Sequence, residues 1–253
     1  MNRVDALITA GVQQHGDELG RARAWAQRRN DLDKFPECGA YDWLESQILY
    51  LLVRVTRPRL VLEISPSSGY SSGFILLALH RNGAGRLLSF DRRPEVEARA
   101  RANFAGAGID ARRWTFYAGE ARETVEAAAV GDDPIDLLFM DSEHTREFAT
   151  WYVRVLFPSV PEGGLIHVHD VRPRGEQPQH PCDEGEGRVV WSYLTRSADE
   201  RDYRYISDIV LAKGDEAEPI PGLTRWPFTD RRVGSNGVEF NPSLWFVKNG
   251  RVR

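Results

Sequence analysis

The chain has few cysteines and no long apolar run. Among its 253 residues are two cysteines, Cys38 and Cys182, which make no disulfide framework and no Cys-x-x-Cys pair. Its apolar stretches, such as Ile48–Val53 and Phe74–Leu79, are much shorter than the ~20 residues that span a bilayer. The first residues also lack the apolar centre of a signal peptide. We therefore expect a cytoplasmic protein with no membrane partner.

A strong charge of either sign is absent as well. The 33 basic and 37 acidic residues give a formal net charge of −4, so no overall attraction to nucleic acid is expected. A composition of 42% hydrophobic and 10% aromatic residues argues against a mostly disordered chain. We expect a globular protein that binds small molecules and not nucleic acid, and the sequence leaves room for a homo-oligomer.

Short apolar runs alternate with helical segments from Leu60 onward. Such alternation implies an α/β fold with a doubly wound, Rossmann-like sheet that is mostly parallel. After Asp170 the alternation stops, and the last strand is expected to be antiparallel. The predicted strands are Leu60–Ile64, Arg86–Phe90, Trp114–Tyr117, Ile135–Met140, Leu165–Val168, Tyr203–Ala212 and Leu244–Val247, and the predicted helices from Leu60 onward are Ser71–His80, Pro94–Ala107, Ala121–Val130, Arg146–Phe157 and Arg188–Arg196.

The chain divides into two parts by its apolar pattern. In residues 1–58 apolar side chains recur every three or four positions, which predicts an N-terminal helical extension. Residues 59–253 are expected to form the ligand-binding domain. Within that domain, residues 171–187 and 214–242 are long segments rich in proline and glycine. Because loops of this length are usually lids or binding loops, we expect them to enclose a substrate together with the N-terminal helices.

The first predicted strand leads into a turn of small residues. Glu63 stands at the end of this strand, just before its last residue Ile64, and the sequence S-P-S-S-G-Y-S-S follows at residues 65–72. In open α/β sheets ligands bind at this carboxyl edge, where small residues allow close approach to the backbone. Asp91 ends the second strand, where a carboxylate can accept hydrogen bonds from both hydroxyls of a ribose. Nicotinamide-binding proteins place an acid similarly, so these features predict a nucleoside ligand without choosing between the two classes.

This segment resembles the first motif of class I S-adenosylmethionine-dependent methyltransferases, with its acid at a strand end and its Gly-Tyr-Ser. Ser65 and Ser67 stand where glycine is usual, and a serine would be strained if the turn needs a positive φ. Gly119-Glu120, after the third strand, is similar to the family's Gly-Asp near adenine. The resemblance covers Leu60 to Val171 and implies S-adenosylmethionine as the cofactor. The donor-binding residues it implies are Glu63, Ser65, Ser67, Gly69, Ser72, Asp91, Gly119, Glu120 and Asp141.

Acidic and histidine side chains follow the fourth and fifth strands, which are neighbours in this fold. In the resemblance to catechol-type O-methyltransferases, Asp141, His169 and Asp170 occupy the positions of ligands to a divalent cation such as Mg²⁺ or Mn²⁺. Alternatively, His144 or His169 acts as a direct general base. The predicted catalytic residues are therefore Asp141, His144 and His169. His167 is expected to point away from the ligand edge and to be a packing residue.

The function implied by the resemblance is O-methylation of a small hydroxylated acceptor, as in bacterial enzymes that act on sugars or natural products. The Asp/Asn-Pro-Pro-aromatic signature of amino-methylating DNA enzymes is absent, since Asp141-Ser142-Glu143-His144 holds its place. Two other functions stay open at this point. One is a nicotinamide-dependent oxidoreductase, and the other is a non-catalytic binding module that keeps the methyltransferase fold.

Overall fold

The computed structural model describes residues 3–31, 43–128, 133–141, 143–171, 185–196, 203–206, 223 and 243–249. Most of the two predicted acceptor loops, at 171–187 and 214–242, lies outside the described residues, and so do Cys38 and Cys182. Within the described residues, every helix is too short or too polar to cross a membrane.

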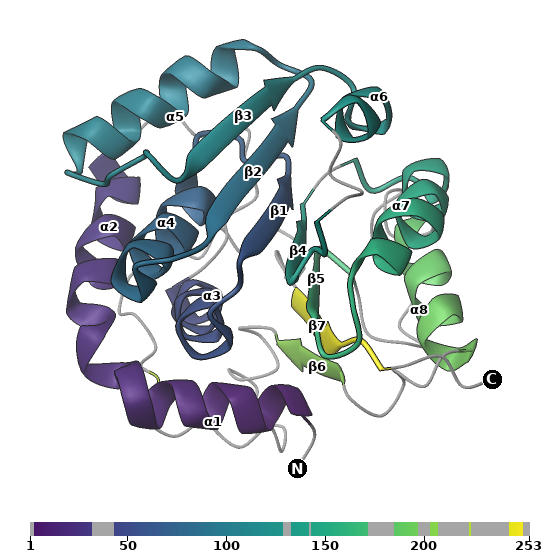
Figure 1. Ribbon diagram of the computed structural model, residues 1–253, viewed down its shortest axis with the longest axis horizontal. Helices are drawn as coiled ribbons and strands as arrows, with labels where there is room; N and C mark the ends of the chain where they lie inside the picture. The colour runs from purple at the N-terminus through teal and green to yellow at the C-terminus, as the bar shows by residue number, and fades with distance from the viewer. Residues whose placement is uncertain are drawn as a thin grey trace, which may run out of the picture.

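One sheet of seven strands forms the centre of the molecule (Figure 1). Its strand order is β3-β2-β1-β4-β5-β7-β6. Strands β1 to β5 pair in parallel, and β7 runs antiparallel to both β5 and β6. The predicted α/β fold with an antiparallel C-terminal strand is therefore confirmed. The strands are β1 Leu60–Ile64, β2 Arg86–Asp91, β3 Trp114–Ala118, β4 Leu137–Met140, β5 Leu165–His169, β6 Tyr203–Ile206 and β7 Ser243–Val247.

Helices cover both faces of this sheet (Figure 1). Figure 1 also shows that α6, α7 and α8 lie beyond one side of the sheet and α1 to α4 beyond the other. The α8 helix begins at Glu186, inside the segment predicted as a loop. The helices are α1 Arg3–His15, the 3-10 helix η1 Gly16–Glu18, α2 Leu19–Asp31, α3 Trp43–Thr56, α4 Tyr70–Asn82, α5 Glu95–Gly106, α6 Ala121–Ala127, α7 Arg146–Ser159 and α8 Glu186–Arg196.

Strand periodicity divides the buried side chains between two cores. In β1, Val61 packs with the core formed by α1 to α5, whereas Leu60 and Leu62 pack with the core formed by α6 to α8. By the same alternation Glu63 faces the α4 side. Because both faces are covered, the strands are almost continuously apolar.

The N-terminal helices share the first of these cores with the sheet. A side chain added at Gly11 of α1 would lie 2.9 Å from the Cβ of Leu51 in α3, so these two helices touch by their backbones. Glu18 of η1 accepts hydrogen bonds of 2.7 Å from Nε of Arg54 and from the hydroxyl of Tyr50. The bond from Arg54 is the main reason that the pKa of Glu18 falls to about 2. The domain boundary at residue 58 stays a prediction.

Candidate active site

Glu63 braces the turn that follows β1. Its carboxylate is fully buried and accepts three hydrogen bonds of 2.6 Å, from the hydroxyls of Ser71, Ser72 and Ser89. Burial raises the pKa of Glu63, and these hydroxyls act against the rise. Glu63 and Ser72, both predicted to bind the donor, thus contact each other beneath the turn and fix the start of α4.

The turn itself contains three residues in the left-handed region. Gly69 has φ 83°, and a Cβ there would lie 2.7 Å from the ring of Phe104. Ser65 and Ser67 have φ 63° and 51°. The strain expected for serine at these positions is therefore present, because an L-residue in this region loses ~1–2 kcal/mol relative to the right-handed region. Strain of this kind gathers at ligand-binding turns.

Replacing Ser65 by glycine is expected to stabilise the protein slightly. Relief of the left-handed strain, ~1–2 kcal/mol, exceeds the extra chain entropy of glycine, ~0.5–1 kcal/mol. The free energy of unfolding, measured by urea denaturation, should rise by about 0.5–1 kcal/mol. Ser68→Gly in the same turn is the control, because Ser68 is not among the positive-φ residues. That control should lose stability, and a loss in Ser65→Gly of the same size would contradict the strain.

Asp91 ends β2 at the position predicted for the ribose. Its side chain is nearly buried, and Arg93 holds both carboxylate oxygens, with Nε 3.1 Å from Oδ1 and a terminal nitrogen 3.2 Å from Oδ2. Gly119, φ 134°, donates its backbone N–H to the carbonyl of Asp91 at 3.0 Å. Glu120 precedes α6 and is exposed. The structure therefore places Asp91, Gly119 and Glu120 at one edge of the sheet, beside the Ser65–Gly69 turn.

Asp91→Ala is expected to weaken binding of S-adenosylmethionine by about 1–3 kcal/mol, because hydrogen bonds to a charged group are lost. Titration calorimetry measures this directly. Arg93→Ala is the matched control, since it removes the ion pair and keeps the carboxylate. Full affinity in Asp91→Ala would show that the donor is held elsewhere.

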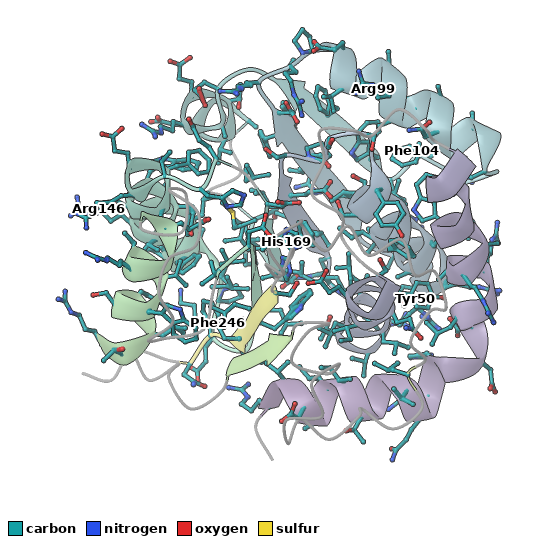
Figure 2. The ribbon with its side chains drawn as sticks, turned by 180° about the vertical axis from the view of Figure 1, so that it is seen from behind. Tyr50, Arg99, Phe104, Arg146, His169 and Phe246 are labelled. Carbon is teal, nitrogen blue, oxygen red and sulfur yellow. The ribbon has the colours of Figure 1, made fainter. Side chains whose placement is uncertain are left out.

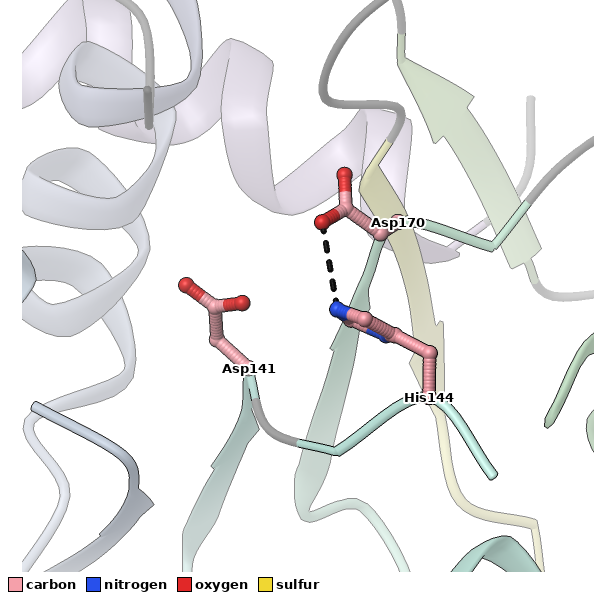
Figure 3. A group of neighbouring side chains, drawn as sticks. All are labelled: Asp141, His144 and Asp170. Atoms are coloured by element: carbon pink, nitrogen blue, oxygen red, sulfur yellow. Dashed lines mark ion pairs between the residues drawn. The ribbon is translucent and has the colours of Figure 1, made fainter. Parts of the chain in front are cut away.

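The ends of β4 and β5 bring Asp141, His144 and Asp170 together (Figure 3). Each offers one ligand atom, and these atoms all lie within 4.8 Å of one another. Nε2 of His144 is 3.3 Å from Oδ2 of Asp170, the ion pair drawn in Figure 3. Asp170 has φ 57°, a left-handed conformation that aspartate tolerates better than most residues. Two carboxylates and one imidazole can together hold a divalent cation.

A buried carboxylate lies behind His144. Oε2 of Glu186, at the start of α8, is 2.6 Å from Nδ1 of His144. The hydroxyl of Tyr152 donates to the other oxygen of Glu186 at 2.7 Å. Burial alone would lower the pKa of His144, but hydrogen bonds to Asp170 and Glu186 outweigh it and raise that pKa to about 11. Both ring nitrogens thus face carboxylates, and these favour the protonated imidazole. A divalent cation bound by Nε2 would take the place of the proton on that nitrogen, since a metal-binding imidazole is neutral.

His169 lies in the middle of the molecule (Figure 2) and is 1% exposed. Its Nδ1 is 3.2 Å from Oδ1 of Asp141 and 3.5 Å from Oδ2 of Asp170, and its Nε2 is 3.7 Å from Oε2 of Glu45. Burial would lower the pKa of His169, but the charges of Asp170 and Asp141 raise it well above the usual value. The ligand set Asp141, His169 and Asp170 stays a prediction, and the structure brings His144 to the same two carboxylates.

The expectation for His167 is half right. It is fully buried, with its ring 4.3 Å from that of Phe139 and 4.4 Å from that of Trp245. It does not point away from the face of His169, however. Residues two apart on a strand share a face, and the two histidine rings are 6.0 Å apart. His167 is therefore a core residue on the same side of the sheet as His169.

Sequence reasoning missed two buried acids in this site, Glu45 and Glu186. Glu186 lies at the end of a segment predicted as a loop, and Glu45 lies in residues 1–58, whose helices were predicted from their apolar side chains. The one available signal for Glu45 is its place in a mostly apolar helix. A charged side chain rarely enters a core without a partner, so such a glutamate predicts a buried partner. Nothing in the spacing of Glu186 indicates that it reaches His144.

Comparisons with known proteins identify the family of this chain. The family described as Methyltransferase domain matches residues 62–171. A protein of Mycobacterium sp. (strain JLS), named as an O-methyltransferase, is 29% identical over 75% of this chain and 81% of its own length. A second protein with that name, from Mycolicibacterium smegmatis, is 31% identical over 65% of this chain and 73% of its own length.

Solved structures show the same fold. The O-methyltransferase TomG from Streptomyces achromogenes, involved in tomaymycin synthesis and solved in complex with SAM, aligns with a TM-score of 0.59. It is 23% identical, and the alignment covers 91% of this chain and 89% of TomG. With this fold and these sequence matches, the chain belongs to the class I S-adenosylmethionine-dependent O-methyltransferases.

Proposed function

We propose that the enzyme methylates a hydroxyl of a small sugar or natural product, assisted by a divalent cation at Asp141, His144 and Asp170. The cluster of these three side chains beside the donor turn carries the proposal. Strand β4 neighbours β1, and the backbone N–H of Asp141 approaches the carbonyl of Ile64 at 3.4 Å. An acceptor at the cluster would therefore lie next to a donor held by Ser65–Gly69 and Asp91.

The residues present suit a divalent cation. The side chains of Asp141 and Asp170 are each 29% exposed, so a ligand can reach them. Glu186 behind His144 gives the carboxylate–imidazole pair that commonly orients a metal-binding histidine. A bound cation would polarise the acceptor hydroxyl and lower its pKa. Because one candidate ligand is an imidazole, Mn²⁺ or a similar ion suits the site better than Mg²⁺.

The chemical step is a displacement at the methyl carbon. The acceptor oxygen forms the new bond to carbon, and the electron pair of the carbon–sulfur bond goes to sulfur, which leaves S-adenosylhomocysteine. The hydroxyl proton passes to water, since both nitrogens of His144 already face carboxylates. Alignment of the two reactants supplies much of the rate in such a reaction.

A small acceptor agrees with the net charge of −4, which offers no general attraction to nucleic acid. TomG, a similar fold, is involved in the synthesis of a natural product. Membership of the methyltransferase family sets aside the oxidoreductase. A non-catalytic module that keeps the fold would transfer no methyl group, so the following screen tests that alternative.

A screen of hydroxylated sugars and phenolics tests the proposal. The protein is incubated with S-adenosylmethionine and Mn²⁺, and O-methylated products are sought by mass spectrometry. We expect methyl transfer to a hydroxyl oxygen in one of these classes. Transfer only to amines or to nucleic acid, added as competing acceptors, would contradict it.

A further inference from the structure

A carboxylate from the N-terminal helices lies directly behind the active-site cluster. Glu45 is in the first turn of α3, and its side chain is 0% exposed. Its Oε2 is 3.7 Å from Nε2 of His169, and Ser243 of β7 donates a hydrogen bond to its Oε1. One oxygen of this buried acid therefore accepts a hydrogen bond, and the other faces the imidazole at ion-pair distance.

The imidazole of His169 connects this acid to the cluster. Nε2 faces Glu45, whereas Nδ1 lies 3.2 Å from Asp141 and 3.5 Å from Asp170. One buried ring is thus surrounded by three carboxylates, which come from α3, from the end of β4 and from the end of β5. Burying a charge costs several kcal/mol unless it is paired, so these groups depend on one another for their places.

We infer that Glu45 is a positioning residue of the methyl-transfer site, acting through His169 on Asp141 and Asp170. A buried carboxylate at ion-pair distance from one ring nitrogen favours the ring orientation in which that nitrogen faces it. Asp141 and Asp170 then contact an imidazole that is held in one orientation. The helix α3 thus covers the sheet and also supplies a positioning residue to the active site.

The competing explanation is that Glu45 serves packing alone, as an acid paired with Ser243 in the core. The two explanations differ in what happens at His144. His144 does not contact Glu45 in any described pair, but it contacts Asp170. A positioning residue should therefore change the surroundings of His144 when it is altered, and a packing residue should not.

Nuclear magnetic resonance of the histidine rings tests this without substrate or metal. The protein is labelled with ¹⁵N in its six histidines, and the ring signals of Glu45→Gln are compared with those of the wild type. We expect the signals of both His169 and His144 to move. The control is Glu18→Gln, another N-terminal acid, whose neighbour is His15 at 3.3 Å. That control should move the signals of His15 and leave those of His144 unchanged.

A kinetic comparison gives the second readout. Because the inference rests on the proposed function for its catalytic consequence, kcat and donor affinity are measured separately. Glu45→Gln should lower kcat by about 10–100-fold, the usual effect of altering a residue that supports a catalytic ligand. The dissociation constant for S-adenosylmethionine should stay near the wild-type value. Glu18→Gln should lose thermal stability and keep its kcat.

Ser243→Ala is the second variant if Glu45→Gln does not fold, since it keeps the charge of Glu45 and removes the hydrogen bonds of the Ser243 hydroxyl to Glu45 and to His167. It should move the His169 and His144 signals in the same sense, by a smaller amount. Unmoved His144 signals in both variants would overturn the inference, even with full methyl transfer in the wild type. If the wild-type protein methylates no hydroxyl, the proposed function is refuted. The histidine signals then still test whether Glu45 positions His169.

Discussion

Exhaustive removal of divalent cations is expected to abolish methyl transfer while leaving the affinity for S-adenosylmethionine nearly unchanged. The two effects separate because most predicted donor contacts lie at the ends of β1, β2 and β3, whereas the proposed cation ligands follow β4 and β5. Asp141 is the one residue predicted to serve both. Without a cation, the carboxylates of Asp141 and Asp170 stand close together with no divalent charge to offset their repulsion. Turnover and calorimetric donor binding are measured on the same chelated, metal-analysed sample.

Restoring individual metals sharpens this test. Mn²⁺ should restore more activity than Mg²⁺ at equal concentration, because the imidazole of His144 is a poor ligand for Mg²⁺. Zinc-free buffers and elemental analysis exclude carried-over metal. Full activity in a sample shown to be metal-free would reject the cation and leave a histidine as the base.

His144→Ala is expected to lower kcat by ~10²–10⁴-fold, the range that accompanies loss of a proton-transferring group. Loss of a proposed cation ligand should give a fall of similar size, so the rate alone does not separate the two roles. Excess Mn²⁺ does, because a site that has lost one of three ligands binds more weakly and can be refilled. Partial recovery in excess Mn²⁺ supports the cation. A fall of the same size at every metal concentration would support the base.

The control for this variant is His80→Ala. His80 is a half-exposed histidine whose nearest acid is Asp110 at 3.9 Å, far along the chain from the cluster. Its loss should leave kcat and the metal dependence unchanged. A comparable fall in His80→Ala would mean that histidine substitutions disturb the protein generally.

Much of the site could be predicted because most of its residues lie at the carboxyl ends of strands. Asp91, Asp141 and His169 each directly follow a predicted strand, and Glu63 is the next-to-last residue of one. Parallel strands bring their carboxyl ends to one edge. The predicted strands were therefore enough to indicate that these residues lie near one another. The left-handed serines were also predictable in kind, since Ser65 stands where glycine is usual and its φ is 63°.

The partners of these residues could not be predicted in the same way. Glu45 reaches His169 from α3, and Glu186 reaches His144 from α8. Neither pair has a fixed spacing, because the contact depends on how a helix packs on the sheet and not on a motif within one element. The orientation of His167 was predicted wrongly, since two residues on one strand with one residue between them share a face.

The most direct test of the account is a crystal structure with S-adenosylhomocysteine and Mn²⁺, with anomalous diffraction data that locate the metal. We predict an anomalous peak among Asp141, His144 and Asp170, with the ribose of the bound nucleoside on Asp91 and its sulfur directed toward that peak. A nucleoside in this position with no peak at the cluster, at a metal concentration that supports turnover, would contradict cation assistance. A nucleoside bound away from the Ser65–Gly69 turn would contradict the site itself.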